Sequence, residues 1–136
     1  MYEHFEHTAD LGLRVRAPDS DALFAEAAEA LSAAIVEDVN VIEPRESLAV
    51  SIAGTDRAYL LFDWLRELLY RFDAERRLFR RFEVRVNDNG LEATAWGEPY
   101  GADRHPLSHE VKAITYHGLR VDREGDGWLA EVIVDI

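Results

Sequence analysis

The sequence predicts a two-layer α+β fold in which two helices pack on a mostly antiparallel sheet of about six strands. Two segments carry apolar residues at the three- and four-residue spacing of helices, and about six short segments have the pattern of strands. Turn residues separate several neighbouring strands, which favours hairpins and hence antiparallel pairing. A length of 136 residues fits one domain over residues 1–136. An interrupted barrel is the alternative arrangement.

The first strand and the first helix are predicted near the N-terminus. Leu11, Leu13 and Val15 alternate with polar or small residues, as in a half-buried strand. Pro18-Asp19-Ser20 provides a helix start, so a helix is expected from about Asp21 to Val36. Its buried face would consist of Phe24, Ala27, Ala28, Leu31 and Ile35.

The second helix follows another alternating segment. Residues 48–52 predict a strand that ends at Gly54, and either Thr55 or Asp56 can cap a helix that reaches about Phe72. The inner face of this helix would consist of Leu61, Leu65, Leu68 and Phe72.

Two hairpins complete the predicted fold. The first pairs residues 82–86 with residues 91–96 across Asn87-Asp88-Asn89-Gly90, because Asn and Gly tolerate positive φ. The second pairs roughly Lys112 to Val121 with Trp128 to Asp135 across Glu124-Gly125-Asp126-Gly127.

Composition limits the classes of function. The absence of cysteine excludes disulfides and thiolate zinc sites, and the charged start of the chain and the lack of a long apolar run predict a cytoplasmic protein without a membrane span. A formal net charge of -12 disfavours a free-standing nucleic-acid-binding protein. Six arginines within residues 71–85 are interpreted as a solvated helix end and strand face rather than a docking patch: Arg71, Arg76, Arg77, Arg80, Arg81 and Arg85.

Common catalytic signatures are absent from the sequence. There is no G-x-S-x-G, no G-x-G-x-x-G and no phosphate-binding loop. His105 and His109 have the i, i+4 spacing of a zinc-binding helix, but Pro106 lies between them and would break that helix.

Three charged side chains stand out as candidate site residues. Asp10 precedes an apolar strand, and Asp135 ends a strand rich in Val and Ile, where the terminal carboxylate of Ile136 would lie close to it. Two neighbouring anions favour a bound cation, although a turn-forming Asp10 and a frayed end are the plainer interpretations. Lys112 is the only lysine beside fourteen arginines, which suggests either a need for a compact ammonium or chance.

The same segments resemble the archease family from end to end. The matching pieces are His7-Thr8-Ala9-Asp10 with Gly12, Asp63-Trp64-Leu65 with Glu67-Leu68-Leu69-Tyr70, Gly97-Glu98-Pro99, Val111-Lys112-Ala113 with Thr115-Tyr116-His117-Gly118-Leu119, and Asp135-Ile136. The segment from Gly54 to Tyr59 departs from the family pattern, which is more acidic and leucine-rich there.

The resemblance implies an accessory role in tRNA splicing and RNA repair. Archeases activate the GTP-dependent tRNA-splicing RNA ligase by promoting its guanylylation and multiple turnover, and they broaden its use of nucleotides. Carried over, the family's metal site consists of Asp10, Asp135 and Ile136, with calcium expected and magnesium or manganese as alternatives. Carboxylate and carbonyl oxygens suit such hard cations. The family member itself would contact RNA only indirectly, through the ligase.

Supporting residues and a rival function complete the hypothesis. His7, Lys112 and His117 are expected to support ligase activation, with no catalytic residue in this chain. The rival is a small metal-dependent hydrolase or phosphotransferase with its own substrate. In that case Asp10 and Asp135 would hold the metal, Lys112 would stabilise phosphate charge, and His7 or His117 would move protons.

Overall fold

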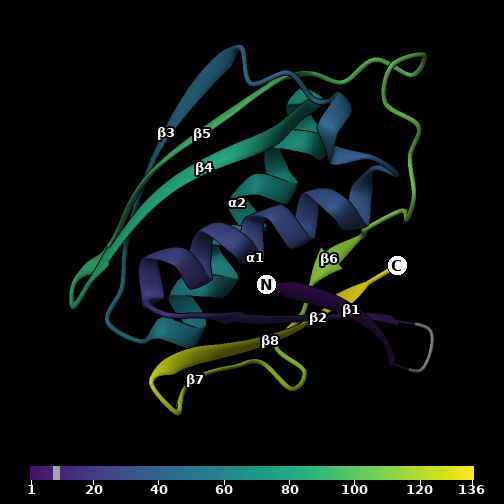
Figure 1. Ribbon diagram of the computed structural model, residues 1–136. Coiled ribbons are helices and arrows are strands. Elements are labelled where there is room, and N and C mark those ends of the chain that lie inside the picture. The colour runs from purple at the N-terminus through teal and green to yellow at the C-terminus, as the bar shows by residue number, and fades with distance from the viewer. Residues whose placement is uncertain (8–9) are drawn as a thin grey trace.

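A computed structural model describes residues 1–7 and 10–136 (Figure 1). Within these residues, strands and helices follow one another along the chain as β1 (Tyr2–His7), β2 (Asp10–Ala17), α1 (Ser20–Ile35), the 3-10 helix η1 (Val39–Val41), β3 (Glu46–Ala53), α2 (Arg57–Glu75), β4 (Arg77–Asn87), β5 (Gly90–Pro99), β6 (Ala113–Ile114), β7 (Arg120–Glu124) and β8 (Gly127–Asp135).

The strands form two antiparallel sheets with the two α-helices between them (Figure 1). One sheet has the order β1-β2-β8-β6, with β7 also paired to β8, and the other has the order β3-β5-β4. The predicted α+β fold with two helices on antiparallel strands is confirmed. The strands divide into two open sheets rather than one, because α1 separates β2 from β3 along the chain and packs against both β2 and β4. The interrupted barrel was wrong.

Helix α1 begins at the predicted cap and covers a strand edge. The side chain of Asp19 accepts a hydrogen bond from Ala22 N at 2.8 Å, and the whole predicted apolar face is buried. Asp21 accepts from Val86 N at 2.7 Å, and Ser32 donates to the carbonyl oxygen of Phe79 at 2.7 Å. These two bonds occupy the free edge of β4, which would otherwise be open to pairing with another chain.

Helix α2 begins at Asp56, whose side chain accepts from the main-chain N–H of Ala58 and Tyr59. It extends three residues beyond the predicted end and stops where Arg76 adopts the left-handed conformation, with φ of 53°. Trp64 is fully buried and donates from Nε1 to the carbonyl oxygen of Phe24 at 3.0 Å. This bond joins α2 to α1.

Two strand predictions need correction. Strand β1 was not predicted. It lies at the edge of its sheet, and its many charged and polar side chains do not alternate with apolar ones, which is the pattern that predicts a strand. The segment from Lys112 to Val121 is not one strand: β6 and β7 are separated by a turn in which Gly118 has a φ of 64°. Thr115 fixes this turn, since both its N–H and its hydroxyl donate to the carbonyl oxygen of Ile133.

Neither helix in the described part of the chain combines the length and the apolar character needed to cross a bilayer.

Candidate functional site

Asp10 and Asp135 lie directly opposite one another at the open end of the first sheet. Asp10 begins β2, Asp135 ends β8, and the register pairs the two residues. Directly paired residues of antiparallel strands have Cβ atoms about 5 Å apart. Like charges at such positions repel one another, so this pair, called here the acidic pair, favours a positively charged ligand.

The same sheet face carries opposite charges elsewhere. Four residues along β2, Arg14 pairs with Glu131 of β8 in the same register, with 3.1 Å between Nη2 and Oε2. Arg14 also contacts Glu3 at 3.0 Å. The charges that face one another across β2 and β8 are therefore opposite in sign at Arg14 and Glu131, and of the same sign at the acidic pair. This difference distinguishes the acidic pair.

Gly12, two residues from Asp10 on β2, allows the ring of Phe5 to lie over this strand. A Cβ atom at this position would lie 2.2 Å from Cζ of Phe5, so a side chain here would displace the ring. The guanidinium of Arg14 lies 4.4 Å from the centroid of the Phe5 ring and also donates a hydrogen bond to Glu131. The face of β2 that carries Asp10 is therefore covered, further along the strand, by Phe5 and Arg14.

Lys112 comes close to the acidic pair through its main chain. Its N–H donates to the carbonyl oxygen of Asp135 at 2.7 Å, and the next residue, Ala113, pairs with Asp135 in the register of β6 and β8. The Lys112 side chain is exposed. Lys112 lies just before β6 rather than within the predicted strand from Lys112 to Val121, because β6 contains only Ala113 and Ile114.

The two supporting histidines lie at the end of β1 and in the turn between β6 and β7. The main chain of His7 pairs with Asp10, whereas its side chain and residues Thr8 and Ala9 lie outside the described residues. His117 is exposed in the turn between β6 and β7, and its N–H donates to the Thr115 hydroxyl at 3.3 Å.

The acidic pair fits part of the coordination of a hard cation. No group of three or more His, Asp or Glu side chains in the described ranges is placed to hold a metal ion. Two carboxylates, with main-chain or terminal oxygens of Ile136, are therefore what the described chain offers. All are hard oxygen donors, as calcium and magnesium prefer, but calcium takes six to eight oxygens. Water or a partner would supply the rest.

The histidine pair at residues 105 and 109 does not form a zinc site. The segment around Pro106 is not helical. His105 is fully buried, and its Nδ1 accepts from Gly101 N at 2.9 Å. The ring proton is therefore on Nε2, which donates to Glu98 at 2.9 Å.

Glu98 is the centre of a buried network that the sequence analysis missed. Its side chain is 1% exposed, and one oxygen accepts from Arg45 at 2.8 Å and from Arg104 at 2.6 Å. The other oxygen accepts from His105 and from Glu43 N, the latter at 2.8 Å. Burial opposes ionisation of this carboxyl, but the donated hydrogen bonds, foremost that of Arg104, outweigh it and hold the pKa of Glu98 well below its usual range.

This network fixes the long connection from β5 to β6. His105 holds the connection to Glu98, and further along Ser108 N and His109 N donate to the last carbonyl oxygens of α1, those of Ile35 and Ala34. These bonds satisfy acceptors that a helix end leaves unpaired. The connection ends at Lys112, whose N–H donates to the carbonyl oxygen of Asp135. A signal was present in the sequence, since Glu98, Arg104 and His105 lie within eight residues.

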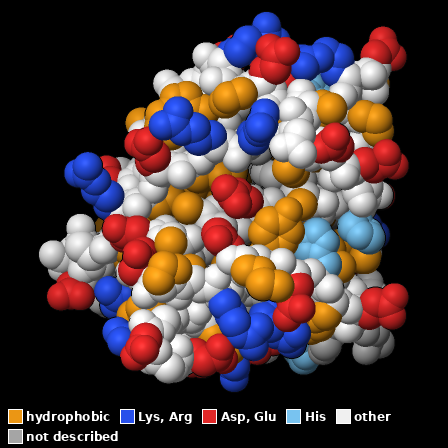
Figure 2. All heavy atoms as spheres, in the orientation of Figure 1, with side chains coloured by type: hydrophobic (Ala, Val, Ile, Leu, Met, Phe, Trp, Pro, Cys, Tyr) orange, Lys and Arg blue, Asp and Glu red, His pale blue; other side chains and the backbone are white. Residues whose placement is uncertain are grey.

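The arginines of residues 71–85 are mostly paired within the chain. Arg71 contacts Glu67 and Glu75, both at 2.9 Å, while Arg81 contacts Glu83 at 2.8 Å and lies 4.5 Å from the Trp96 ring centroid. Figure 2 shows acidic and basic side chains interspersed over the face in view, without a basic patch.

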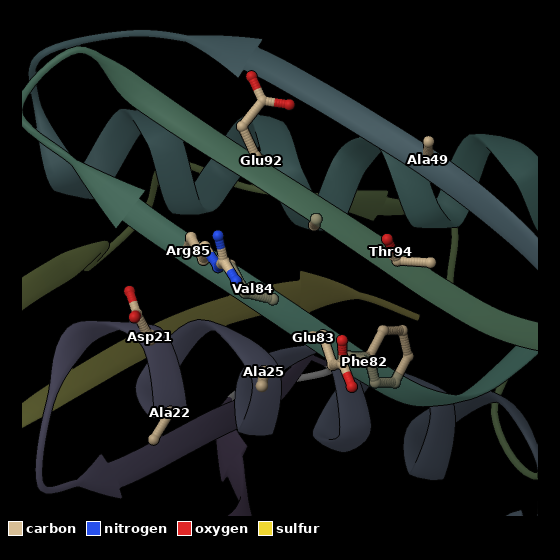
Figure 3. A pocket seen from close by; sticks show the side chains of 11 residues that line it. Asp21, Ala22, Ala25, Ala49, Phe82, Glu83, Val84, Arg85, Glu92 and Thr94 are labelled. Atoms are coloured by element: carbon tan, nitrogen blue, oxygen red, sulfur yellow. The ribbon is translucent and has the colours of Figure 1, made fainter.

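A hollow of about 660 Å³ opens beside α1 and the three-stranded sheet (Figure 3). Asp21 and Ala25 of α1 line one side, and Arg85 of β4 and Glu92 of β5 line the other. Among the described residues, none of the sequence-predicted site residues lines this hollow, so it is separate from the acidic pair.

The comparisons with known proteins place the chain in a family. The model of the archease protein family matches residues 2–136. The chain belongs to the archease family. It is 42% identical to the protein archease of Methanopyrus kandleri, with 99% of each chain covered. It is 40% identical to the protein archease of Pyrococcus abyssi, with 99% of this chain and 98% of that one covered.

Solved structures of the family have the same fold. The solution structure of protein 1598 from Methanobacterium thermoautotrophicum has a TM-score of 0.87 and 36% identity over 99% of this chain and 98% of that chain. The crystal structure of an archease from Thermotoga maritima, described as a possible chaperone, has a TM-score of 0.61 and 20% identity over 100% of this chain and 98% of that chain. At that identity the second likeness concerns the fold alone.

Proposed function

We propose that this archease is an accessory protein that activates the GTP-dependent tRNA-splicing RNA ligase, promoting its guanylylation and turnover and broadening its nucleotide use. The observation that carries the proposal is the acidic pair, with the Lys112 main chain bound to Asp135. Asp10, Asp135 and Ile136 are each partly exposed at strand ends. Such an open group can complete a site that a partner shares.

Asp10, Asp135 and Ile136 would hold a divalent hard cation, with calcium expected first and magnesium or manganese as alternatives. When bound, this ion would neutralise the repulsion within the acidic pair and present positive charge to phosphate or carboxylate groups of the partner. Lys112 would add a compact cation beside it. RNA would be contacted only through the ligase, because the net charge of -12 repels free nucleic acid.

The direct test combines this protein with the RNA ligase of the same organism. Ligase guanylylation from labelled GTP and multiple-turnover joining of a 3'-phosphate RNA end to a 5'-hydroxyl end are followed with and without the archease. Faster guanylylation and more turnovers per ligase are expected. RNA joining or phosphate hydrolysis by the archease alone, with no effect on the ligase, would instead support the small metal-dependent enzyme.

Lys112→Arg is expected to weaken activation although it preserves the charge, because the guanidinium is wider and planar whereas the ammonium is a point donor. Loss of one charge-assisted hydrogen bond costs about 1.5 to 3 kcal/mol, which corresponds to roughly ten- to a hundredfold weaker stimulation. The melting temperature should remain within about 2 °C of wild type, since the side chain is exposed. Arg85→Lys, an exposed exchange on β4, serves as the control. Full stimulation by Lys112→Arg would contradict a specific role for the ammonium.

A further inference from the structure

We propose that Tyr59, Phe62 and Tyr116, called here the aromatic patch, form a second docking surface for the protein partner that engages the acidic pair. The partner is the RNA ligase, so the inference rests on the proposed function. It adds a contact that is separate from metal binding and from Lys112.

The patch is built from two elements that are distant in sequence. Tyr116, in the turn between β6 and β7, stacks on Phe62 of α2 with ring centroids 3.9 Å apart and an interplanar angle of 14°. Tyr59, in the first turn of α2, packs edge-on against Tyr116 at 5.7 Å. Phe62 is buried beneath them, whereas Tyr59 and Tyr116 are each 58% exposed. The two tyrosines therefore present most of their surface to solvent from a packed base.

The patch is held rigidly. Thr115, next to Tyr116, donates from both its N–H and its hydroxyl to the Ile133 carbonyl oxygen, at 3.0 and 2.8 Å. Asp56 caps the helix turn that carries Tyr59. Binding would thus cost little side-chain ordering, which is the property of tyrosines at the centre of protein interfaces.

The patch lies close to the acidic pair along β8. Thr115 binds Ile133, which lies two residues before Asp135 on β8, or about 7 Å along the strand. The segment from Lys112 to Tyr116 runs beside β8 over this interval, with exposed side chains at both of its ends. Val132 and Val134 face the helices, so the side chain of Asp135 lies on the other face of the sheet, whereas Tyr116 packs on α2. A partner that contacts both would therefore extend around the sheet edge formed by Lys112 and β6.

Charge favours a protein over single-stranded RNA as the occupant. RNA that stacks on aromatic rings also needs cations for its phosphates. The guanidinium of Arg66 lies 5.4 Å from the Phe62 ring centroid, but it already contacts Asp63 at 3.5 Å. The chain carries a net charge of -12. RNA phosphates are bound by basic groups, so a ligase that holds RNA ends would complement the acidic charge of this chain.

The test measures ligase affinity with labelled archease and its variants. The Tyr59→Ala, Tyr116→Ala double variant is expected to bind the ligase about ten- to a hundredfold more weakly. Its calcium affinity, measured by titration calorimetry, should equal that of wild type. Tyr70→Ala is the matched control, because Tyr70 is 55% exposed on the same helix, three turns beyond Tyr59. Tyr59→Ala alone should weaken binding several-fold, and it keeps the Tyr116 ring over Phe62 in place.

Each contrary outcome has a separate meaning. If wild type stimulates the ligase and the folded variants bind it equally well, the patch proposal fails and the proposed function stands. If wild type neither binds nor stimulates the ligase, both fail. If wild type binds single-stranded RNA or forms a dimer, and the tyrosine variants lose that property but keep ligase affinity, the patch serves RNA or a second copy and the inference is overturned.

Discussion

Replacing both members of the acidic pair, by Asp10→Asn and Asp135→Asn, is expected to abolish calcium-dependent stabilisation and ligase activation while leaving the fold intact. Asparagine has nearly the same shape as aspartate, and the change removes the repulsion between two carboxylates that face one another across β2 and β8. The variant is therefore expected to fold without calcium, which circular dichroism can check.

The size of the effect follows from linkage between binding and folding. Calcium at a hundred times its dissociation constant stabilises the wild type by about 2.7 kcal/mol, which raises the melting temperature by roughly 10 °C in a domain of this size. The double variant should show no such rise. Thermal unfolding at increasing calcium concentration, with chelator as reference, measures the difference, and ligase guanylylation provides the functional readout.

A charge-matched control separates the site from general electrostatics. Asp103→Asn with Asp126→Asn removes two exposed carboxylates elsewhere, changes the net charge equally, and should keep the calcium response. An equal calcium response in the acidic-pair variant and in wild type would remove the metal site from the mechanism. Retained ligase activation in a variant that no longer binds calcium would show that the metal is not needed.

The helices and hairpins followed from local patterns in the sequence. The Asp19 and Asp56 caps, the apolar faces of α1 and α2, and the turn between β4 and β5 each depend on residues within a few positions of one another. Such local preferences agree with the final fold, and they were therefore predictable.

The division into two sheets depended on contacts that local patterns do not contain. Strand β1 pairs only with β2 and has charged side chains, so its alternation is not apolar. The break between β6 and β7 depends on Thr115, whose partner Ile133 is eighteen residues away. Sequence reasoning assigned one strand from about Lys112 to Val121, as the hairpin partner of Trp128 to Asp135.

The candidate site was predictable in part. Asp10 and Asp135 came from their odd positions at strand ends and from the family resemblance, and the register of β2 and β8 places them opposite one another. Glu98 was seen only as part of the Gly97-Glu98-Pro99 motif. Its role depends on Arg45, fifty-three residues away, and on a loop whose course the sequence does not reveal.

Glu98→Gln is expected to lower the free energy of unfolding by about 3 kcal/mol at pH 7. Removing one partner of a buried ion pair costs about 3 to 5 kcal/mol, and the lower end applies because Arg45 and Arg104 are largely hydrated. The amide offers one acceptor oxygen instead of two and turns an N–H₂ group toward other donors. The freed connection should also loosen Lys112, so ligase stimulation should fall more than in a variant of equal stability.

The pH dependence has a defined sign. The folded-state pKa of Glu98 lies below its value of 4.5 in the unfolded chain, so ionised Glu98 stabilises the fold above about pH 4.5. This contribution decreases as the pH falls below 4.5 toward the folded-state pKa, where the carboxyl takes up a proton. The difference in unfolding free energy between wild type and Glu98→Gln should therefore be constant from pH 8 to pH 5 and shrink below pH 4.5.

Urea unfolding at pH 7 and pH 3.5 measures this difference, with Glu83→Gln as the control. Glu83 is 65% exposed and contacts Arg81 on the surface, where an ion pair contributes at most about 1 kcal/mol. A Glu98→Gln variant as stable as wild type at pH 7 would show that the buried carboxylate does not hold the connection to the sheet. A difference that grew toward low pH would contradict a depressed pKa, because a carboxyl with a raised pKa destabilises the fold at neutral pH and its protonation relieves that cost. Either outcome would show that the Glu98 network does not position Lys112. The main-chain hydrogen bond from Lys112 to Asp135 would then be the contact that holds it.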